Sequence, residues 1–122
     1  MEKKPPFYVG VDLHKTIAQV CVRDSKGDVL EDRRRRLLDR DQGRALIEYL
    51  APFAAEGRIA VESLGINRWF VNSCREAGYD VIVAHASALG LKKSGVKTDK
   101  RDAREIARRL YLGDLQRHAR SY

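Results

Sequence analysis

The sequence has little cysteine, and it lacks the apolar runs and leader patterns that mark membrane or exported proteins. Its two cysteines, Cys21 and Cys74, lie inside apolar periodic segments, so we expect reduced, small core residues rather than a disulfide, a catalytic thiol or a metal site. No signal-peptide pattern is visible, and no apolar run is long enough to cross a membrane. We therefore expect a cytoplasmic protein with no membrane partner.

Charge, by contrast, is abundant and unbalanced. Lysine and arginine total 24 against 17 aspartates and glutamates, which gives a net charge of +7 and a pI of about 9.7. Hydrophobic residues make up 43% and charged residues 34% of the 122 positions, a composition typical of one globular domain. The basic excess favours a polyanionic partner, although it says nothing about the fold.

Apolar periodicity divides the chain into strands and helices. Strands are predicted over residues 7–12, 17–24, 29–37, 58–62 and 79–85. Helices are predicted over residues 41–55 and 66–78 and from Thr98 onward. Pro52 is expected to kink or shorten the first helix, and Gly78 is a plausible C-terminal cap of the second. Trp69 and Phe70 in that second helix are expected to be core residues rather than base-stacking platforms.

The order of these elements predicts an α/β fold with a mixed five-stranded sheet and flanking helices. The first three strands should form an antiparallel meander, with SKGD as the first tight turn, and the later two should run parallel to the first through right-handed crossovers. This is the ribonuclease H-like order, in which the fourth strand lies beside the first. We expect an N-terminal tail over residues 1–6, this domain over residues 7–117, and the truncated start of another segment over residues 118–122.

Four acidic residues stand where this fold would gather them. Asp12 and Glu62 end the first and fourth strands, whose neighbouring ends would lie roughly 4.8 Å apart. Asp99 and Asp102 are three residues apart, so both project from one face of the last helix. Because like charges repel, a fold that gathers carboxylates usually does so around divalent metal ions, here Mg²⁺ or Mn²⁺. Gly10 would let a backbone or ligand approach closely.

Each acid also has an ordinary structural explanation. Acidic residues in the first turn of a helix are favoured by the helix dipole, and Thr98 would make a natural N-cap. An aspartate after a strand is often a turn former. The metal hypothesis therefore rests on the four acids together and on the element order, with no Cys/His cluster to suggest zinc.

Basic residues surround the predicted acidic site. The candidates for phosphate contact are Lys92, Lys93, Lys97, Lys100 and Arg101, followed by Arg104, Arg108 and Arg109. The helical members could instead form a solvated face with pairs such as Arg101–Glu105. The run from Arg33 to Arg36 could contact nucleic acid or protect a sheet edge. His14, Lys15 and His85 could face the site, although His14 and Lys15 also suit a polar turn.

Three segments match a known family. These segments are YVGVDLHK, AVE and VKTDKRDAREIA. Over about residues 7–115, the chain resembles the N-terminal domain of the DEDD transposases of insertion-sequence family one-ten. Relatives include the Piv and MooV-type DNA invertases, and the fold is similar to that of the RuvC Holliday-junction resolvase. By position, the resemblance makes Asp12, Glu62, Asp99 and Asp102 the catalytic, metal-binding tetrad.

The resemblance also implies partners. Family members are Mg²⁺-dependent enzymes that cut and join DNA phosphodiesters, and a structured guide RNA directs them. Full-length members add a second domain with a serine nucleophile, which this chain lacks, so we expect the chain to be incomplete alone. The full-length protein is expected to be a homo-oligomer.

Other functions remain open at this stage. One alternative is a stand-alone ribonuclease H-like nuclease with two metals, and another is a non-catalytic RNA-binding module that has kept the acids. A sugar-kinase or actin-type ATPase half shares the strand order, but it would need a glycine-rich phosphate hairpin after the first strand. The segment LHKTIAQV contains no glycine.

Overall fold

A single mixed sheet of five strands forms the centre of the molecule. The computed structural model describes residues 5–62, 68–84 and 99–115. The strands are β1 (Phe7–Leu13), β2 (Ile17–Asp24), β3 (Val29–Arg36), β4 (Arg58–Glu62) and β5 (Asp80–Ala84). Their order is β3-β2-β1-β4-β5; β1, β2 and β3 are antiparallel, and β4 and β5 run parallel to β1. The predicted α/β architecture, with the fourth strand beside the first, is confirmed.

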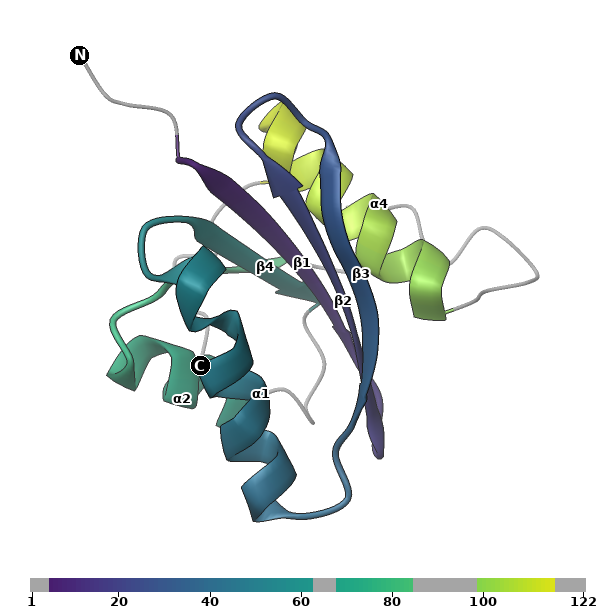
Figure 1. The fold of residues 1–122 in the computed structure, drawn as a ribbon, viewed down its shortest axis with the longest axis vertical. Coiled ribbons are helices and arrows are strands. Elements are labelled where there is room, and N and C mark those ends of the chain that lie inside the picture. The colour runs from purple at the N-terminus through teal and green to yellow at the C-terminus, as the bar shows by residue number, and fades with distance from the viewer. Residues whose placement is uncertain (1–4, 63–67, 85–98, 116–122) are drawn as a thin grey trace.

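The helices cover both faces of the sheet. They are α1 (Arg40–Ala54), α2 (Arg68–Glu76) and α4 (Asp99–Leu112). Helices α1 and α2 pack on one face, whereas α4 lies across β1 and β2 on the other (Figure 1). Within the described ranges, no helix has the length and apolar character needed to span a membrane.

The helix ends follow local hydrogen bonding. Helix α1 starts after Asp39, whose side chain accepts the backbone N–H of Gln42, and it ends two residues beyond Pro52. Helix α2 is shorter than the predicted range 66–78, of which residues 66 and 67 lie outside the described part. Gly78 has a φ of 87°, and the N–H of Tyr79 donates to the carbonyl of Cys74, so the predicted glycine cap is confirmed.

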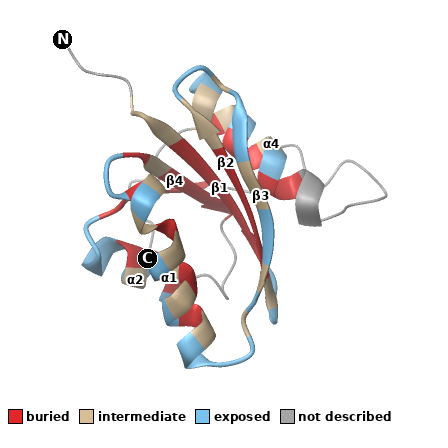
Figure 2. Ribbon diagram, in the orientation of Figure 1, coloured by how far each residue is buried: buried red, intermediate tan, exposed pale blue. Residues whose placement is uncertain are grey.

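Alternation along the strands divides the interior into two cores. On the α1/α2 face, β1 contributes Val9, Val11 and Leu13 to a large cluster that includes Leu46 and Phe70. The opposite, α4 face carries smaller clusters, built mainly from the residues Tyr8, Ala60, Ile82, Ile106, Leu110, Cys21, Ala103 and Ala107. Figure 2 shows the central strands buried between these layers and β3 largely exposed at the sheet edge.

Both cysteines are core residues, as predicted, whereas the expectation for Trp69 is wrong. Cys21 and Cys74 are buried and unpaired. Burial is the largest cause that raises their pKa values, to about 11 and about 12, so both remain protonated thiols at neutral pH. Phe70 is fully buried, but Trp69 is 40% exposed. Adjacent helical residues point about 100° apart, so only one of the two can occupy the centre of the buried face.

Gly10 sets the distance between β1 and α4. A Cβ atom built on Gly10 would lie 2.4 Å from the backbone N of Ala107 and 2.5 Å from the backbone O of Ala103. Only glycine permits this approach, which confirms the expectation that a backbone segment comes close at this position. The contact holds the first turns of α4 directly against the strand that carries Asp12.

Candidate metal centre

Three of the four predicted acids are buried on the α4 face of the sheet. Asp12 is 1% exposed, and Glu62 and Asp102 are each 4% exposed. Asp12 and Tyr8 share the parity that points toward α4, as do Glu62 and Ala60 on the neighbouring strand. Asp102 comes from the beginning of α4, the helix that packs on that same face. Strand alternation and helix packing therefore bring these carboxylates into one region.

The three carboxylates interact electrostatically. The pKa of the Asp12 carboxyl is raised from 3.8 to about 6, and burial is the largest cause. The negative charges of Asp102 and Glu62 also contribute to this rise, while the hydrogen bond and charge of His14 oppose it. Bringing the acids together thus destabilises the ionised form of Asp12, and a bound cation would relieve this cost.

His14 is a direct partner of Asp12. Its Nε2 atom lies 2.8 Å from Oδ2 of Asp12, and its backbone N–H donates to the carbonyl of Ile17 in the β1–β2 turn. The imidazole is 45% exposed, whereas the Asp12 side chain is 2% exposed. The sequence marked His14 only as a residue that could face the site. The position of His14 two residues after Asp12 was the only hint in the sequence of a contact between them. The β1–β2 turn brings the His14 ring back onto the Asp12 carboxylate.

A second polar cluster lies beside the acids on the same face. Gln19 is opposite Asp12 in the β1–β2 register and is 3% exposed. Its Nε2 donates to Oδ1 of Asp32 across 3.0 Å, and Asp32 also accepts from Nε of Arg104 on α4. No sequence signal identified this cluster, because its members are far apart in the chain. It ties the edge strand β3 to α4.

The donor chemistry of the site fits a hard divalent cation. Carboxylate oxygens are the preferred ligands of Mg²⁺ and Mn²⁺, and a cation would offset the repulsion that the other two acids exert on Asp12. Among the residues that the structure describes, however, no three potential ligands stand close enough to hold one ion. The side chain of Asp99 lies outside the described part, although its backbone begins α4. The complete tetrad therefore stays a prediction.

The predicted phosphate contacts are largely beyond the described residues. Lys92, Lys93, Lys97 and His85 lie outside them, and Lys100 and Arg101 belong to α4 with side chains that are not described. On the described helix, Arg108 and Arg109 both bind the carboxylate of Glu105, at 2.9 Å and 3.2 Å. These two arginines fit the hypothesis of a solvated helix face with intrahelical pairs.

A hollow lies near the acids but on the other side of the sheet. It has a volume of about 930 Å³ and lies between the end of β1, the beginning of α1 and α2. Leu13, His14, Leu38 and the exposed Trp69 line it. Because Asp12, Glu62 and Asp102 are absent from its walls, the hollow is separate from the acidic site and shares only His14 with its immediate surroundings.

Comparison with known proteins agrees with the sequence motifs. A protein-family model described as "Transposase", for the DEDD transposases of insertion-sequence family one-ten, matches residues 9–121. No curated protein sequence matches the chain.

Among solved structures, the ethanolamine utilization protein EutJ from Carboxydothermus hydrogenoformans is similar, with 17% sequence identity and a TM-score of 0.45. The match covers 77% of this chain and 42% of the EutJ chain. A likeness at this level carries no inference about function.

Proposed function

Because the chain belongs to the DEDD transposases of insertion-sequence family one-ten, we propose that it is the metal-binding, ribonuclease H-like (RuvC-like) domain of an enzyme that cuts and joins DNA phosphodiesters. The observation that carries this proposal is the burial of Asp12, Glu62 and Asp102 on one face of the sheet, from three separate elements. Buried acids that raise a neighbour's pKa are typical of functional sites.

In this proposal, Asp12, Glu62, Asp99 and Asp102 hold Mg²⁺ or Mn²⁺. A divalent cation bound there would stabilise the negative charge that develops on a phosphodiester during cleavage and joining. The rest of the machinery belongs to the chain itself. His14 fixes the orientation of the Asp12 carboxylate through its 2.8 Å contact. Gly10 allows α4 to lie close enough to present Asp102 beside β1.

The partners of the complete enzyme are also part of the proposal. We assign the substrate as DNA, and we place the phosphates of its backbone near Lys92, Lys93, Lys97, Lys100 and Arg101. A structured guide RNA, a second domain with the serine nucleophile and a homo-oligomeric assembly complete the active enzyme. The net charge of +7 supports a polyanionic partner of this kind.

The metal hypothesis can be tested by thermal stability. The melting temperature of the chain is measured in EDTA and across a titration of Mg²⁺ and Mn²⁺, with and without a short DNA duplex. A ligand that binds only the folded state stabilises it by RT ln(1 + L/Kd), where L is the free ligand concentration, so the melting temperature rises with the metal concentration. We expect both metals to stabilise the wild type, and we expect Asp12→Asn to lose most of this gain.

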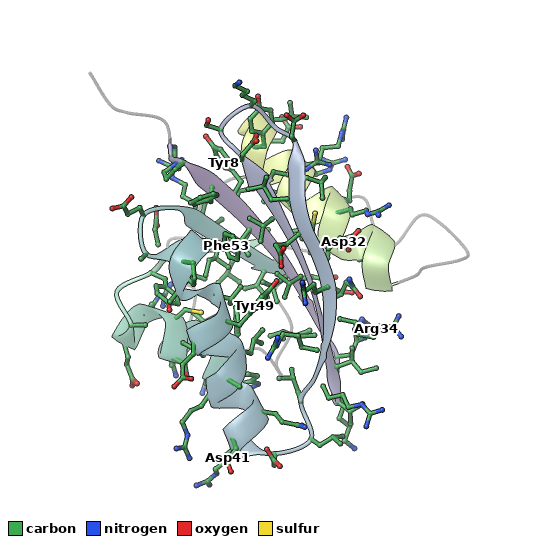
Figure 3. All side chains as sticks on the ribbon, in the orientation of Figure 1. Tyr8, Asp32, Arg34, Asp41, Tyr49 and Phe53 are labelled. Carbon is green, nitrogen blue, oxygen red and sulfur yellow. The ribbon has the colours of Figure 1, made fainter. Side chains whose placement is uncertain are left out.

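A matched control separates site binding from general screening of charge. Asp41 carries the same charge, its side chain is 86% exposed, and it lies at the start of α1 (Figure 3), the helix on the opposite face of the sheet from α4. Asp41→Asn should keep the full metal-dependent gain. Equal metal responses in the wild type and in Asp12→Asn, with or without DNA, would contradict a metal site at Asp12.

A further inference from the structure

The arginine run on β3 is divided between the two faces of the sheet. Arg33 and Arg35 share the face of α1, where each has a partner. Nε of Arg33 lies 2.9 Å from the carboxylate of Glu31, and the guanidinium of Arg35 lies 4.6 Å from the centre of the Tyr49 ring. The Tyr49 hydroxyl in turn donates to Glu31. These two arginines are therefore part of the packing between β3 and α1.

Arg34 points to the opposite face, the one that carries the acids. It is in register with Gln19, and Arg36 is in register with Ile17, so both lie on the α4 side of the sheet. Figure 3 shows Arg34 projecting from β3 on that side. Both arginines are exposed, and among the described side chains, at residues 5–62, 68–84 and 102–115, neither guanidinium has a hydrogen-bond or ion-pair partner.

The nearest acid on this face does not neutralise them. Asp32, two residues before Arg34, accepts hydrogen bonds from Gln19 and from Arg104. The Asp32 side chain is 12% exposed, and its ion pair with Arg104 on α4 already compensates its charge. Among the described side chains, the two positive charges on the α4 side of β3 thus have no partner, and the acid beside them is already paired with Arg104.

The unpaired arginines lie in line with the acidic site. Asp12 is paired with Gln19 across β1 and β2, and Gln19 is paired with Arg34 across β2 and β3. Two strand spacings separate the Cα atoms of Asp12 and Arg34, a distance of roughly 10 Å. A polyanion whose backbone reaches Asp12 from the edge of the sheet would pass over Arg34, which can bind phosphate oxygens in a bidentate manner.

We propose that Arg34 and Arg36 form a phosphate-binding track for the DNA strand that enters the acidic site, whereas Arg33 and Arg35 hold β3 against α1. The proposal rests on the proposed function, because the acids give the track its direction. Protection of a sheet edge does not explain the division, since that role requires charge on the edge but no difference in partners between the two faces.

The test compares two double variants with equal loss of charge. Arg34→Gln/Arg36→Gln removes the track, and Arg33→Gln/Arg35→Gln removes the arginines that face α1. Affinity of the 122-residue chain for a DNA duplex and for an RNA duplex of the same sequence is measured by fluorescence anisotropy over a range of salt concentrations. EDTA is present throughout, so binding is read without any contribution from a metal site.

We expect the track variant to bind the DNA duplex about tenfold more weakly at low salt. We also expect its plot of log affinity against log salt to lose about two units of slope, because two phosphate contacts disappear. The control variant should retain most of the wild-type affinity and slope, and its melting temperature should fall more, since it breaks contacts with Glu31 and Tyr49.

Equal weakening in the two variants would overturn the proposal, because it would show a response to net charge alone. Weakening confined to the RNA duplex would overturn the assignment to DNA. Neither result would affect the metal titration, since that experiment measures how the melting temperature depends on metal binding at Asp12. Conversely, a failed metal titration would leave the difference between the two arginine variants readable in EDTA.

Discussion

The two faces of the sheet carry different kinds of side chain, although the same strands contribute to both. The α1/α2 face is a continuous aliphatic and aromatic core, with Phe70, Leu46 and Leu50 fully buried over the valines of β1 and β2. The α4 face substitutes Gly10, Ala103 and other small residues at its centre, and it buries acids at one end. One face is closed by large side chains and the other by close approach of the backbone.

This difference separates stability from function. Burial of large apolar side chains supplies most of the favourable free energy of folding, whereas buried carboxylates that repel one another oppose it. The α1/α2 face can therefore support an α4 face that is costly in the absence of a cation. Changes to the first face should alter stability alone, and changes to the second should alter stability together with the site.

The largest effect is expected on the α1/α2 face, at Phe70. Phe70→Ala should lower the free energy of unfolding by about 4 kcal/mol, because it leaves a cavity in the main core. The adjacent Trp69→Ala should cost under about 1.5 kcal/mol, since Trp69 is 40% exposed. Urea denaturation in EDTA measures both. Equal losses would show that the exposed and buried positions of α2 are not as the structure has them.

On the α4 face, the corresponding test is Gly10→Ala. The added Cβ would lie within 2.5 Å of the backbone of α4, so the helix must move and carry Asp102 away from Asp12. We expect a loss of about 3 kcal/mol in the free energy of unfolding, together with a weaker metal-dependent rise in melting temperature. Unlike Phe70→Ala, this substitution should therefore affect both readouts.

Gly43 provides the control for Gly10→Ala. A Cβ at Gly43, inside α1, would lie 3.4 Å from the Trp69 ring, an ordinary contact. Gly43→Ala should raise the free energy of unfolding by about 0.5–1 kcal/mol, because alanine favours the helix. If Gly10→Ala were as well tolerated as Gly43→Ala, the close approach of α4 to β1 would be contradicted.

The dependence of stability on pH should identify the acidic face. The folded-state pKa of Asp12 is about 6, above the ordinary 3.8, so the folded chain holds this proton more tightly than the unfolded chain does. The stabilisation from this difference is complete below about pH 4 and is lost as pH rises through about 6. Between pH 4 and 7 in EDTA, Asp12 should therefore lower the free energy of unfolding by up to about 3 kcal/mol.

Asp12→Asn should remove this component of the pH profile, while the control Asp41→Asn should keep it. His14, Glu62 and Asp102 all act on the same carboxyl, so the difference between variant and wild type is the quantity to compare. An identical profile in wild type and Asp12→Asn would contradict the raised pKa.

The periodicity of the sequence predicted the sheet and its order because each strand carries a strong local signal. Strand segments show either alternating polar and apolar residues or a continuous apolar run, as in FYVGVD and RIAVE. The order of the strands and helices then restricts the topology to very few choices. Contacts between distant residues left no such signal. The Asp32 interactions with Gln19 and Arg104 depend on strand register and helix placement together.

The site was predictable to a similar depth. The sequence placed Asp12 and Glu62 at strand ends, and the structure buries both on one face with Asp102. The contact of His14 with Asp12 depends on a turn whose conformation the residue types alone do not determine. The expectation that both Trp69 and Phe70 are core residues failed for Trp69, because a short helix offers too few turns to fix the centre of its buried face.

The smallest effect among the changes to the α4 face should come from Asp102, and the sign of that effect is the informative part. Asp102→Asn keeps the shape of the side chain and removes one of the negative charges that raise the pKa of Asp12. In EDTA the melting temperature should therefore rise by about 3–5 °C, which corresponds to roughly 1 kcal/mol. With saturating Mn²⁺ the order should reverse, because the wild type gains from a ligand that the variant has lost. A lower melting temperature for Asp102→Asn in EDTA would mean that its carboxylate stabilises the fold through its own hydrogen bonds, and the repulsion among the acids would then be too weak to require a cation.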